Sequence, residues 1–278
     1  MVEVIPCDLH VHPDYSIDAR SSISQYCRKA QEINLSVIGF TTHYDVNPAR
    51  ASKDAFMVVD GNWVFPDDRA IDRYLADIEL ARREFAELKI LAGLEIDYFP
   101  GIEDEVSRLS RKFAFDYFIG SVHCLDDLAI SETKDAKVYF QSHTPEQMAD
   151  SYFKLLFDCV DSGLFDVVGH ADYYVRFAPP YFGEQTYDLF KGRLERIGRA
   201  AARNGTGFEI NTLPVRRGKP FHPRLDFLKE LLSFGATVNS IGSDSHHVDD
   251  LGKGIIEAIL ELESNNLSLN LFYAVQKT

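Results

Sequence analysis

The sequence predicts an α/β fold in which parallel strands form a single barrel and helices cover its outer surface. Two observations carry this prediction: short apolar runs rich in β-branched and aromatic residues recur along the chain, and stretches with helical periodicity lie between them. Strands that are apolar along their whole length must be buried on both faces, as they are in a parallel sheet covered by helices. Seven strand–helix units in about 250 residues fit a (β/α) barrel better than two domains, and an open doubly wound sheet is the alternative.

The predicted strands are apolar runs that end in one or two polar residues. They cover residues 2–9, 35–41, 89–94, 115–121, 165–169, 207–210 and 236–241. No run reaches the 18 apolar residues that a membrane-spanning helix needs, so no such helix is expected.

The predicted helices place apolar residues three or four positions apart on one face. These faces lie within residues 23–30, 71–81, 148–156, 189–201 and 225–232. Expected helix starts are Ser21 or Ser22, Thr144-Pro145 and His222-Pro223, and expected stops are Gly163, Gly205 and Gly235. Residues 44–68 and 126–141 break the pattern, and we expect the first to be a long loop near the functional site and the second to be another insertion.

Composition excludes several classes of protein. The 278 residues are 45% hydrophobic, and 29 Lys and Arg against 43 Asp and Glu give a formal net charge of −14. This excess of acid opposes binding to nucleic acid or an anionic membrane but allows a small anionic substrate in a locally positive pocket. The four cysteines lack CxxC spacing, and residues 1–6 lack a signal-peptide pattern, so we expect reduced thiols and a cytoplasmic location.

Polar residues follow the predicted strands, and six of the nine histidines are among them. The set is His10, His12, His43, Glu95, His123, His170, Asp244 and His246. The carboxyl ends of barrel strands converge at one face of the barrel, so these side chains are expected to be neighbours. One histidine at a strand end is usually a core or surface residue, but their joint placement favours a metal centre.

Imidazole and carboxylate ligands without thiolates suit Zn, Mn or Fe. With Asp18 added, nine candidate side chains are too many for one tetrahedral ion and fit two or three divalent ions, with Glu95 able to bridge a pair. Such a centre can hold a hydroxide between metals at neutral pH and polarise substrate oxygens. This chemistry predicts hydrolysis, most naturally of a phosphate ester.

These motifs resemble those of the PHP (polymerase and histidinol phosphatase) superfamily, and more specifically its monofunctional histidinol-phosphatase branch. They span residues 10–246 in the family's order. The matching motifs are His10-Val11-His12 with Asp18, Thr42-His43, Gly93-Leu94-Glu95, Ser121-Val122-His123, Gly169-His170-Ala171-Asp172, Glu209-Ile210-Asn211-Thr212 and Ser243-Asp244-Ser245-His246.

The resemblance implies a distorted (β/α)7 barrel, one domain over residues 1–278, with a trinuclear metal centre. Its three expected ligand sets are His10, His12, Glu95 and Asp244 for the first ion, Glu95, His123 and His170 for the second, and Asp18, His43 and His246 for the third.

The resemblance also implies a reaction: hydrolysis of L-histidinol phosphate to L-histidinol and phosphate in histidine biosynthesis. A hydroxide bridging the first two ions would attack phosphorus, and Asp244 or His246 would deliver a proton to the leaving alkoxide through a water. Arg176 and Arg216 stand at spacings where this branch binds phosphate, and a guanidinium can hold phosphate oxygens bidentately. The alternative for each arginine is an ion pair with a surface acid.

Three other functions stay open at this point. The first is hydrolysis of another small phosphate ester, such as a nucleotide or sugar phosphate. The second is an amidohydrolase-type barrel, which also begins with HxH but is expected to have no Glu at the third strand and a bridging lysine after the fourth, where Glu95 and His123 stand here. The third is a noncatalytic metal-binding module. Oligomeric state is not predicted.

Several nearby residues receive smaller roles. Asp8 and Asp172 are expected to orient ligand histidines through their second nitrogen. Histidines outside the set are expected to be surface or capping groups; they are His143, His222 and His247.

Overall fold

Seven parallel strands form the centre of the molecule in the computed structural model, which describes residues 7–274. In spatial order the strands are β1 (Cys7–Val11), β2 (Val37–Tyr44), β5 (Lys89–Asp97), β6 (Tyr117–Ser121), β9 (Val167–Val168), β10 (Gly207–Asn211) and β11 (Val238–Gly242). Each neighbouring pair is parallel. A parallel bridge between Val11 and Ser245 brings the two edges together, which nearly closes the barrel. The predicted fold class is confirmed.

Each predicted apolar run corresponds to one of these strands. Residues 2–6 of the first run lie outside the described residues. The prediction that residues 1–6 carry no signal peptide also concerns that part of the chain. The run at 165–169 shortens to the two residues of β9, because Gly169 and His170 already leave the sheet toward the functional site.

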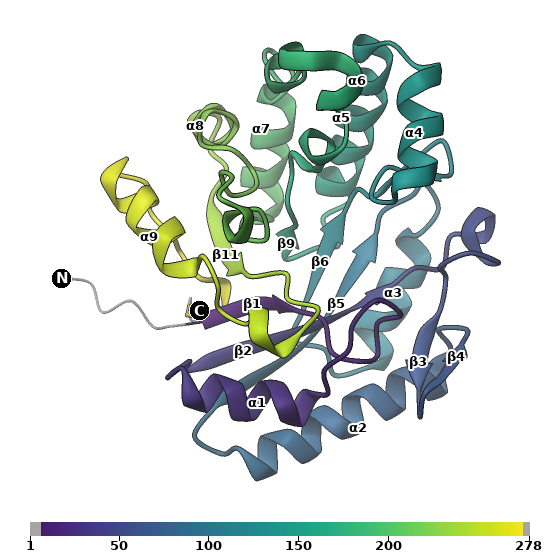
Figure 1. Cartoon of the computed structure of the whole chain (residues 1–278), viewed down its shortest axis with the longest axis vertical. Helices are drawn as coiled ribbons and strands as arrows, with labels where there is room; N and C mark the ends of the chain where they lie inside the picture. Colours follow the sequence, from purple (N-terminus) through teal and green to yellow (C-terminus); the bar gives the residue numbers. More distant parts are fainter. Residues whose placement is uncertain (1–6, 275–278) are drawn as a thin grey trace.

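Helices cover the outside of the sheet, as Figure 1 shows. The helices longer than two turns are α1 (Ile23–Glu32), α2 (Asp68–Glu84), α3 (Glu103–Lys112), α4 (Thr133–Ser142), α5 (Pro145–Asp161), α7 (Glu195–Asn204), α8 (Leu225–Ser233) and α9 (Ile255–Ser264). In the figure, α1 and α2 lie along β1, β2 and β5, whereas α5, α7 and α8 lie on the side of β6 to β11. No helix within residues 7–274 combines the length and hydropathy of a membrane span.

Two of the three predicted helix starts agree with the structure. The side chains of Ser22 and Thr144 each accept a hydrogen bond from the backbone N–H three residues later, and the Gln side chain at that position accepts one from the backbone N–H of the capping residue. The start at His222-Pro223 is wrong, because α8 begins only at Leu225. His222 instead exchanges backbone hydrogen bonds with Asn211, which ties this loop to β10.

The two insertions contain secondary structure of their own. Residues 44–68, expected to be a loop, carry a hairpin of β3 (Met57–Val59) and β4 (Asn62–Val64). Asp60-Gly61, both with positive φ, form its turn, which is the dipeptide that such hairpins favour. The second insertion begins inside a hairpin, formed by β7 (Cys124–Leu125) and β8 (Leu128–Ala129), and continues into α4.

Alternation along the strands divides the barrel into an apolar core and a polar site. On β5, Ile90, Ala92 and Leu94 belong to the apolar cluster that includes the buried faces of α1 and α2. Leu91 belongs to a second cluster with Leu9, Ile119, Ile210 and Ile241. Glu95 shares the face of Leu91 because side chains two or four apart on a strand point the same way. The polar site therefore continues the barrel's inner face.

Tyr117 fills the middle of this inner face. Its hydroxyl donates to the Leu9 carbonyl at 2.7 Å. A Cβ on Gly39 would collide with the Tyr117 hydroxyl and one on Gly93 with its ring, so these two positions require glycine for close packing.

Candidate metal and phosphate site

The predicted ligand residues lie together at the carboxyl end of the strands. His10, His43 and Glu95 lie on β1, β2 and β5, and the others follow the ends of β1, β6, β9 and β11. The His12 ring stacks between those of His43 and His246, and its centroid is 4.2 Å from each of theirs. On the other side, the His123 and His170 rings are 5.0 Å apart. The structure thus brings together side chains from residue 10 to residue 246, as the prediction required.

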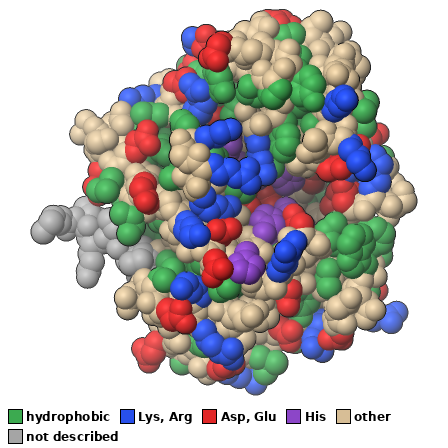
Figure 2. All heavy atoms as spheres, in the orientation of Figure 1, with side chains coloured by type: hydrophobic (Ala, Val, Ile, Leu, Met, Phe, Trp, Pro, Cys, Tyr) green, Lys and Arg blue, Asp and Glu red, His purple; other side chains and the backbone are tan. Residues whose placement is uncertain are grey.

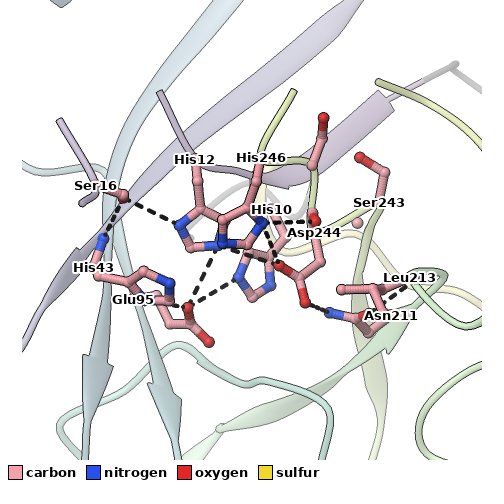
Figure 3. A network of polar contacts seen from close by, with 12 residues as sticks. His10, His12, Ser16, His43, Glu95, Asn211, Leu213, Ser243, Asp244 and His246 are labelled. Carbon is pink, nitrogen blue, oxygen red and sulfur yellow. Dashed lines mark hydrogen bonds and ion pairs between the residues drawn. The ribbon is translucent and has the colours of Figure 1, made fainter. Parts of the chain in front are cut away.

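Glu95 lies between the two groups of histidines (Figure 3 shows the first group). Its Oε2 is 3.0 Å from His43 Nδ1 and 3.3 Å from His10 Nε2. Its Oε1 is 2.9 Å from His170 Nε2 and 3.5 Å from His123 Nε2. One oxygen per group is the placement that a carboxylate needs to bridge two cations.

Several sets of three ligand atoms lie within 4.8 Å of one another. These sets are His10, His12 and Glu95; Glu95, His123 and His170; His10, His170 and Asp244; and His12, His43 and His246. Asp18 extends the last set, because its Oδ2 is 3.2 Å from His246 Nε2 and 3.8 Å from His43 Nε2.

Unpaired buried nitrogens show that these residues fit divalent metal ions. The Nε2 atoms of His10 and His12 are buried and make no hydrogen bond, although Glu95 Oε2 lies within 3.3 and 3.5 Å of them. A buried polar atom without a partner is costly, and a metal bond would remove that cost. Nitrogen and oxygen donors in this mixture suit Zn, Mn or Fe.

The charges of the cluster point the same way. Burial alone would raise the pKa of Glu95, but His10 and His123 hold it well below its usual value. Burial would lower the pKa of His43, but Asp18 and Glu95 raise it to about 9. Burial lowers the pKa of His123 to about 3. Nearby histidines also hold the pKa of Asp244 well below its usual value, so Glu95 and Asp244 stay ionised and attract positive charge, which protons supply when metal ions do not.

Glu209 orients His10 from behind. Its Oε1 accepts a hydrogen bond from His10 Nδ1 at 2.7 Å, which leaves Nε2 of the ring facing Glu95. Its Oε2 accepts from the His170 backbone N–H at 3.1 Å and from Asn211 Nδ2 at 3.2 Å. A ligand histidine usually has such a partner. Sequence reasoning assigned Glu209 no role, although a buried acid in an apolar strand was an available signal.

Asp8 and Asp172, which were expected to orient ligand histidines, bind other groups. Asp8 accepts hydrogen bonds from the backbone N–H groups of Ser243 at 2.8 Å and Gly252 at 2.9 Å. Asp172 Oδ1 lies 2.5 Å from Nδ1 of His222, which is buried rather than at the surface. Both predictions were wrong because a carboxylate after a strand also meets the backbone of neighbouring loops.

Arg176 and Arg216 line one cavity of about 450 Å³ together with seven of the nine candidate ligands, all except His10 and His12. Arg176 Nη1 donates to the Tyr173 hydroxyl at 2.8 Å. Arg216 Nη2 donates to the Asp244 carbonyl at 3.3 Å, and its Nη1 is 3.4 Å from Asp250. Figure 2 shows Lys and Arg side chains gathered beside the histidines in a central hollow. The cavity therefore combines cationic groups with the cluster of ligands.

Comparison with known proteins gives a family match and similar relatives. A family model described as PHP domain matches residues 8–213. A probable histidinol-phosphatase of Clostridium acetobutylicum is 26% identical, over 94% of each chain. A histidinol-phosphatase of Bacillus subtilis is 24% identical, over 91% of this chain and 98% of its own.

Two solved structures have a similar fold. A histidinol phosphate phosphatase of Lactococcus lactis, complexed with Zn, L-histidinol and phosphate, gives a TM-score of 0.76 at 22% identity over 95% of each chain. A putative histidinol phosphatase of Listeria monocytogenes gives 0.70 at 18% identity, over 90% of this chain and 99% of its own. At these identities the likeness establishes the architecture.

Proposed function

Because the chain belongs to the PHP domain family, we propose that it is a metal-dependent phosphomonoesterase that hydrolyses L-histidinol phosphate to L-histidinol and phosphate. The observation that carries the proposal is the single cavity that combines Arg176 and Arg216 with the cluster of histidines and acids. The relatives named histidinol-phosphatase, which match nearly the whole chain, support this substrate.

We assign the metal ligands as three sets, of which the first two share Glu95. They are His10, His12, Glu95 and Asp244; Glu95, His123 and His170; and Asp18, His43 and His246. Bound divalent ions would lower the pKa of a water and polarise phosphoryl oxygens, which is the chemistry that phosphate-ester hydrolysis needs. Zn, Mn and Fe all match these donors.

The two arginines bind and orient the phosphoryl group. A planar guanidinium holds two phosphate oxygens at once and offsets their charge as it grows in the transition state. Arg216 is fixed by the Asp244 carbonyl and by Asp250, and Arg176 by the Tyr173 hydroxyl, so both approach the cavity from held positions. These contacts use only part of each guanidinium and leave N–H groups for the substrate.

Two residues are candidates to deliver a proton to the leaving alcohol. His246 and Asp244 both line the cavity, and His246 Nδ1 is 3.2 Å from the Asp244 carbonyl. Either side chain can hold a water against the ester oxygen and pass a proton to it as the alcohol leaves. Glu209 keeps His10 in the orientation that the cluster requires.

The same proposal treats residues 1–278 as one domain and places the reaction in the cytoplasm. Cys7, Cys27, Cys124 and Cys159 are all buried and unpaired with one another, which suits a reducing compartment. The net charge of −14 argues against a nucleic-acid substrate.

Phosphate release by the purified protein tests this proposal. L-Histidinol phosphate should give a kcat/KM about a hundredfold above that of a nucleoside monophosphate or a sugar phosphate. His170→Asn should abolish most of this activity, whereas His247→Asn should not, because residue 247 is exposed and an Asn side chain there can still accept from the Asp249 backbone N–H. Equal rates on all esters, or a faster rate on a nucleotide, would contradict the proposed substrate.

A further inference from the structure

The two ring nitrogens of His12 need two different partners. Nε2 lies 3.5 Å from Glu95 Oε2 and 3.4 Å from Asp244 Oδ1, so this nitrogen points into the cluster. When Nε2 binds a metal ion, Nδ1 must carry the ring proton and donate it. Within residues 7–274, the hydrogen-bond partner of Nδ1 is the Ser16 hydroxyl, with 3.4 Å between the two atoms.

Ser16 joins His12 to a second ligand, His43. The Ser16 side chain is buried, and its Oγ accepts a hydrogen bond from the His43 backbone N–H at 3.0 Å. The same oxygen is 2.8 Å from Thr42 Oγ1. Figure 3 shows the contacts of Ser16 with both histidines. One hydroxyl therefore contacts a residue of the first ligand set and a residue of the third.

A count of hydrogens gives one arrangement for the metal-bound state. A serine hydroxyl has one hydrogen to donate and two lone pairs with which to accept. The His43 backbone N–H occupies one lone pair, and the His12 Nδ1–H occupies the other. The hydrogen of the Ser16 hydroxyl is then left for Thr42 Oγ1. All three bonding positions of this hydroxyl are in use when His12 presents Nε2 to an ion.

The backbone of Ser16 is fixed by the first insertion and by a turn of its own loop. Ser16 forms an antiparallel bridge with Met57 at the start of β3. Its carbonyl accepts a hydrogen bond from the Ala19 N–H at 3.2 Å, which closes the turn that carries Asp18. The hydroxyl is therefore held in place beside His12, and Asp18, two residues along the chain, is itself a ligand of the third set.

We propose that Ser16 is a positioning residue of the metal centre, which holds His12 with Nε2 directed at the ions and links the first ligand set to the third. The His12 ring stacks between the rings of His43 and His246, so a change in its angle would displace ligands of the third set. This inference rests on the proposed metal ligands and adds to them a residue that binds no ion itself.

Zinc binding tests the role of Ser16 without turnover. Ser16→Ala removes the acceptor of the His12 Nδ1–H and of the His43 N–H and adds no bulk. In competition with a coloured chelator, the Zn²⁺ affinity should fall about tenfold or more, the effect expected when a ligand histidine loses its partner. Ser16→Thr, which keeps the hydroxyl, should restore most of the lost affinity. Ser24→Ala is the matched control, because the Ser24 Oγ has no hydrogen-bond partner in the described part of the chain.

The proton on the His12 ring gives a second readout. In zinc-loaded protein with ¹⁵N-labelled histidine, His12 should show a slowly exchanging Nδ1–H signal, identified by its absence in His12→Gln. Ser16→Ala should remove this signal or let it exchange rapidly with water, and Ser24→Ala should keep it. If Ser16 were needed only for folding, its loss would change neither the Zn²⁺ affinity nor the His12 signal.

An unchanged Zn²⁺ affinity in Ser16→Ala, or a His12 Nδ1–H signal that persists in this variant, would overturn the role of Ser16. An unsubstituted protein that binds zinc with the expected His12 signal but releases no phosphate from L-histidinol phosphate would contradict the proposed function and leave this role standing. The two failures are therefore distinguishable.

Discussion

The two carboxylate oxygens of Glu95 face different groups of histidines, and this one residue joins the halves of the site. Glu95 reaches this position because it lies on the inner face of β5, four residues after Leu91, whose side chain fills the barrel below. At the scale of single residues, the site depends on such alternation and on the groups that hold each ligand in place.

Glu209→Gln tests the group that holds His10. Glutamine keeps the shape of Glu209 but weakens the hydrogen bond to His10 Nδ1 and removes a negative charge from beneath the cluster. We expect metal affinity to fall about 10- to 100-fold, the usual effect of losing such a partner. Activity measured against metal concentration gives the shift, and Glu87→Gln, at an exposed position, is the control. An unchanged metal dependence would remove Glu209 from the site.

Tyr173→Phe tests how Arg176 is held. The substitution removes the hydroxyl that accepts from Arg176 Nη1 and keeps the ring beside His170. KM for L-histidinol phosphate should rise about fivefold while kcat changes less, because one neutral partner of a charged group is lost. Steady-state kinetics separate the two constants, with Tyr181→Phe, a more exposed tyrosine, for comparison. A fall in kcat alone would place Tyr173 in the chemical step instead.

At the scale of elements, Arg50 connects the two insertions that follow β2 and β6. It is 1% exposed, binds Asp54 within the first insertion, and reaches Asp135 and the Asp127 carbonyl in the second. The second insertion supplies Ser131 and Glu132 to the arginine-lined cavity, so this ion-pair network supports part of the cavity wall.

Arg50→Met should therefore destabilise the protein. Removing a buried cation leaves its acids unpaired, and because Asp54 is partly exposed we expect a loss of about 2–3 kcal/mol in the free energy of unfolding. Chemical denaturation measures the change. Arg69→Met, at a side chain that is 96% exposed, should alter stability by less than about 0.5 kcal/mol. A loss below 1 kcal/mol for Arg50→Met would show that the insertions hold together without it.

The elements also show which features of the structure can be predicted from the sequence. Apolar runs and capping residues such as Ser22 and Thr144 predicted the strands and two helix starts, because both patterns are local. The partners of Asp8, Asp172 and Glu209 were not predictable, since they depend on which loops meet across the barrel. The hairpin at Asp60-Gly61 was predictable from its turn, but its strands have only three residues each.

At the scale of the whole molecule, arginines are concentrated at the functional site although the chain as a whole is acidic. The chain has a net charge of −14, but the cavity that adjoins the histidines carries Arg176, Arg216 and Arg217. Carboxylates also line this cavity, so its arginines attract a phosphate ester by direct contact, and bound divalent ions would add the positive charge that steers the ester at low salt. Strand order places this region at the carboxyl end of the barrel, where βα loops build functional sites.

Metal removal tests the central claim, that a metal cluster at this end of the barrel carries the hydrolysis of L-histidinol phosphate. The measurement is phosphate release from chelator-treated protein as Zn²⁺, Mn²⁺ or Fe²⁺ is returned stepwise. We expect the rate to fall at least about a hundredfold after chelation and to return as two or three ions bind per chain. A metal-free protein that keeps its full rate would contradict the account.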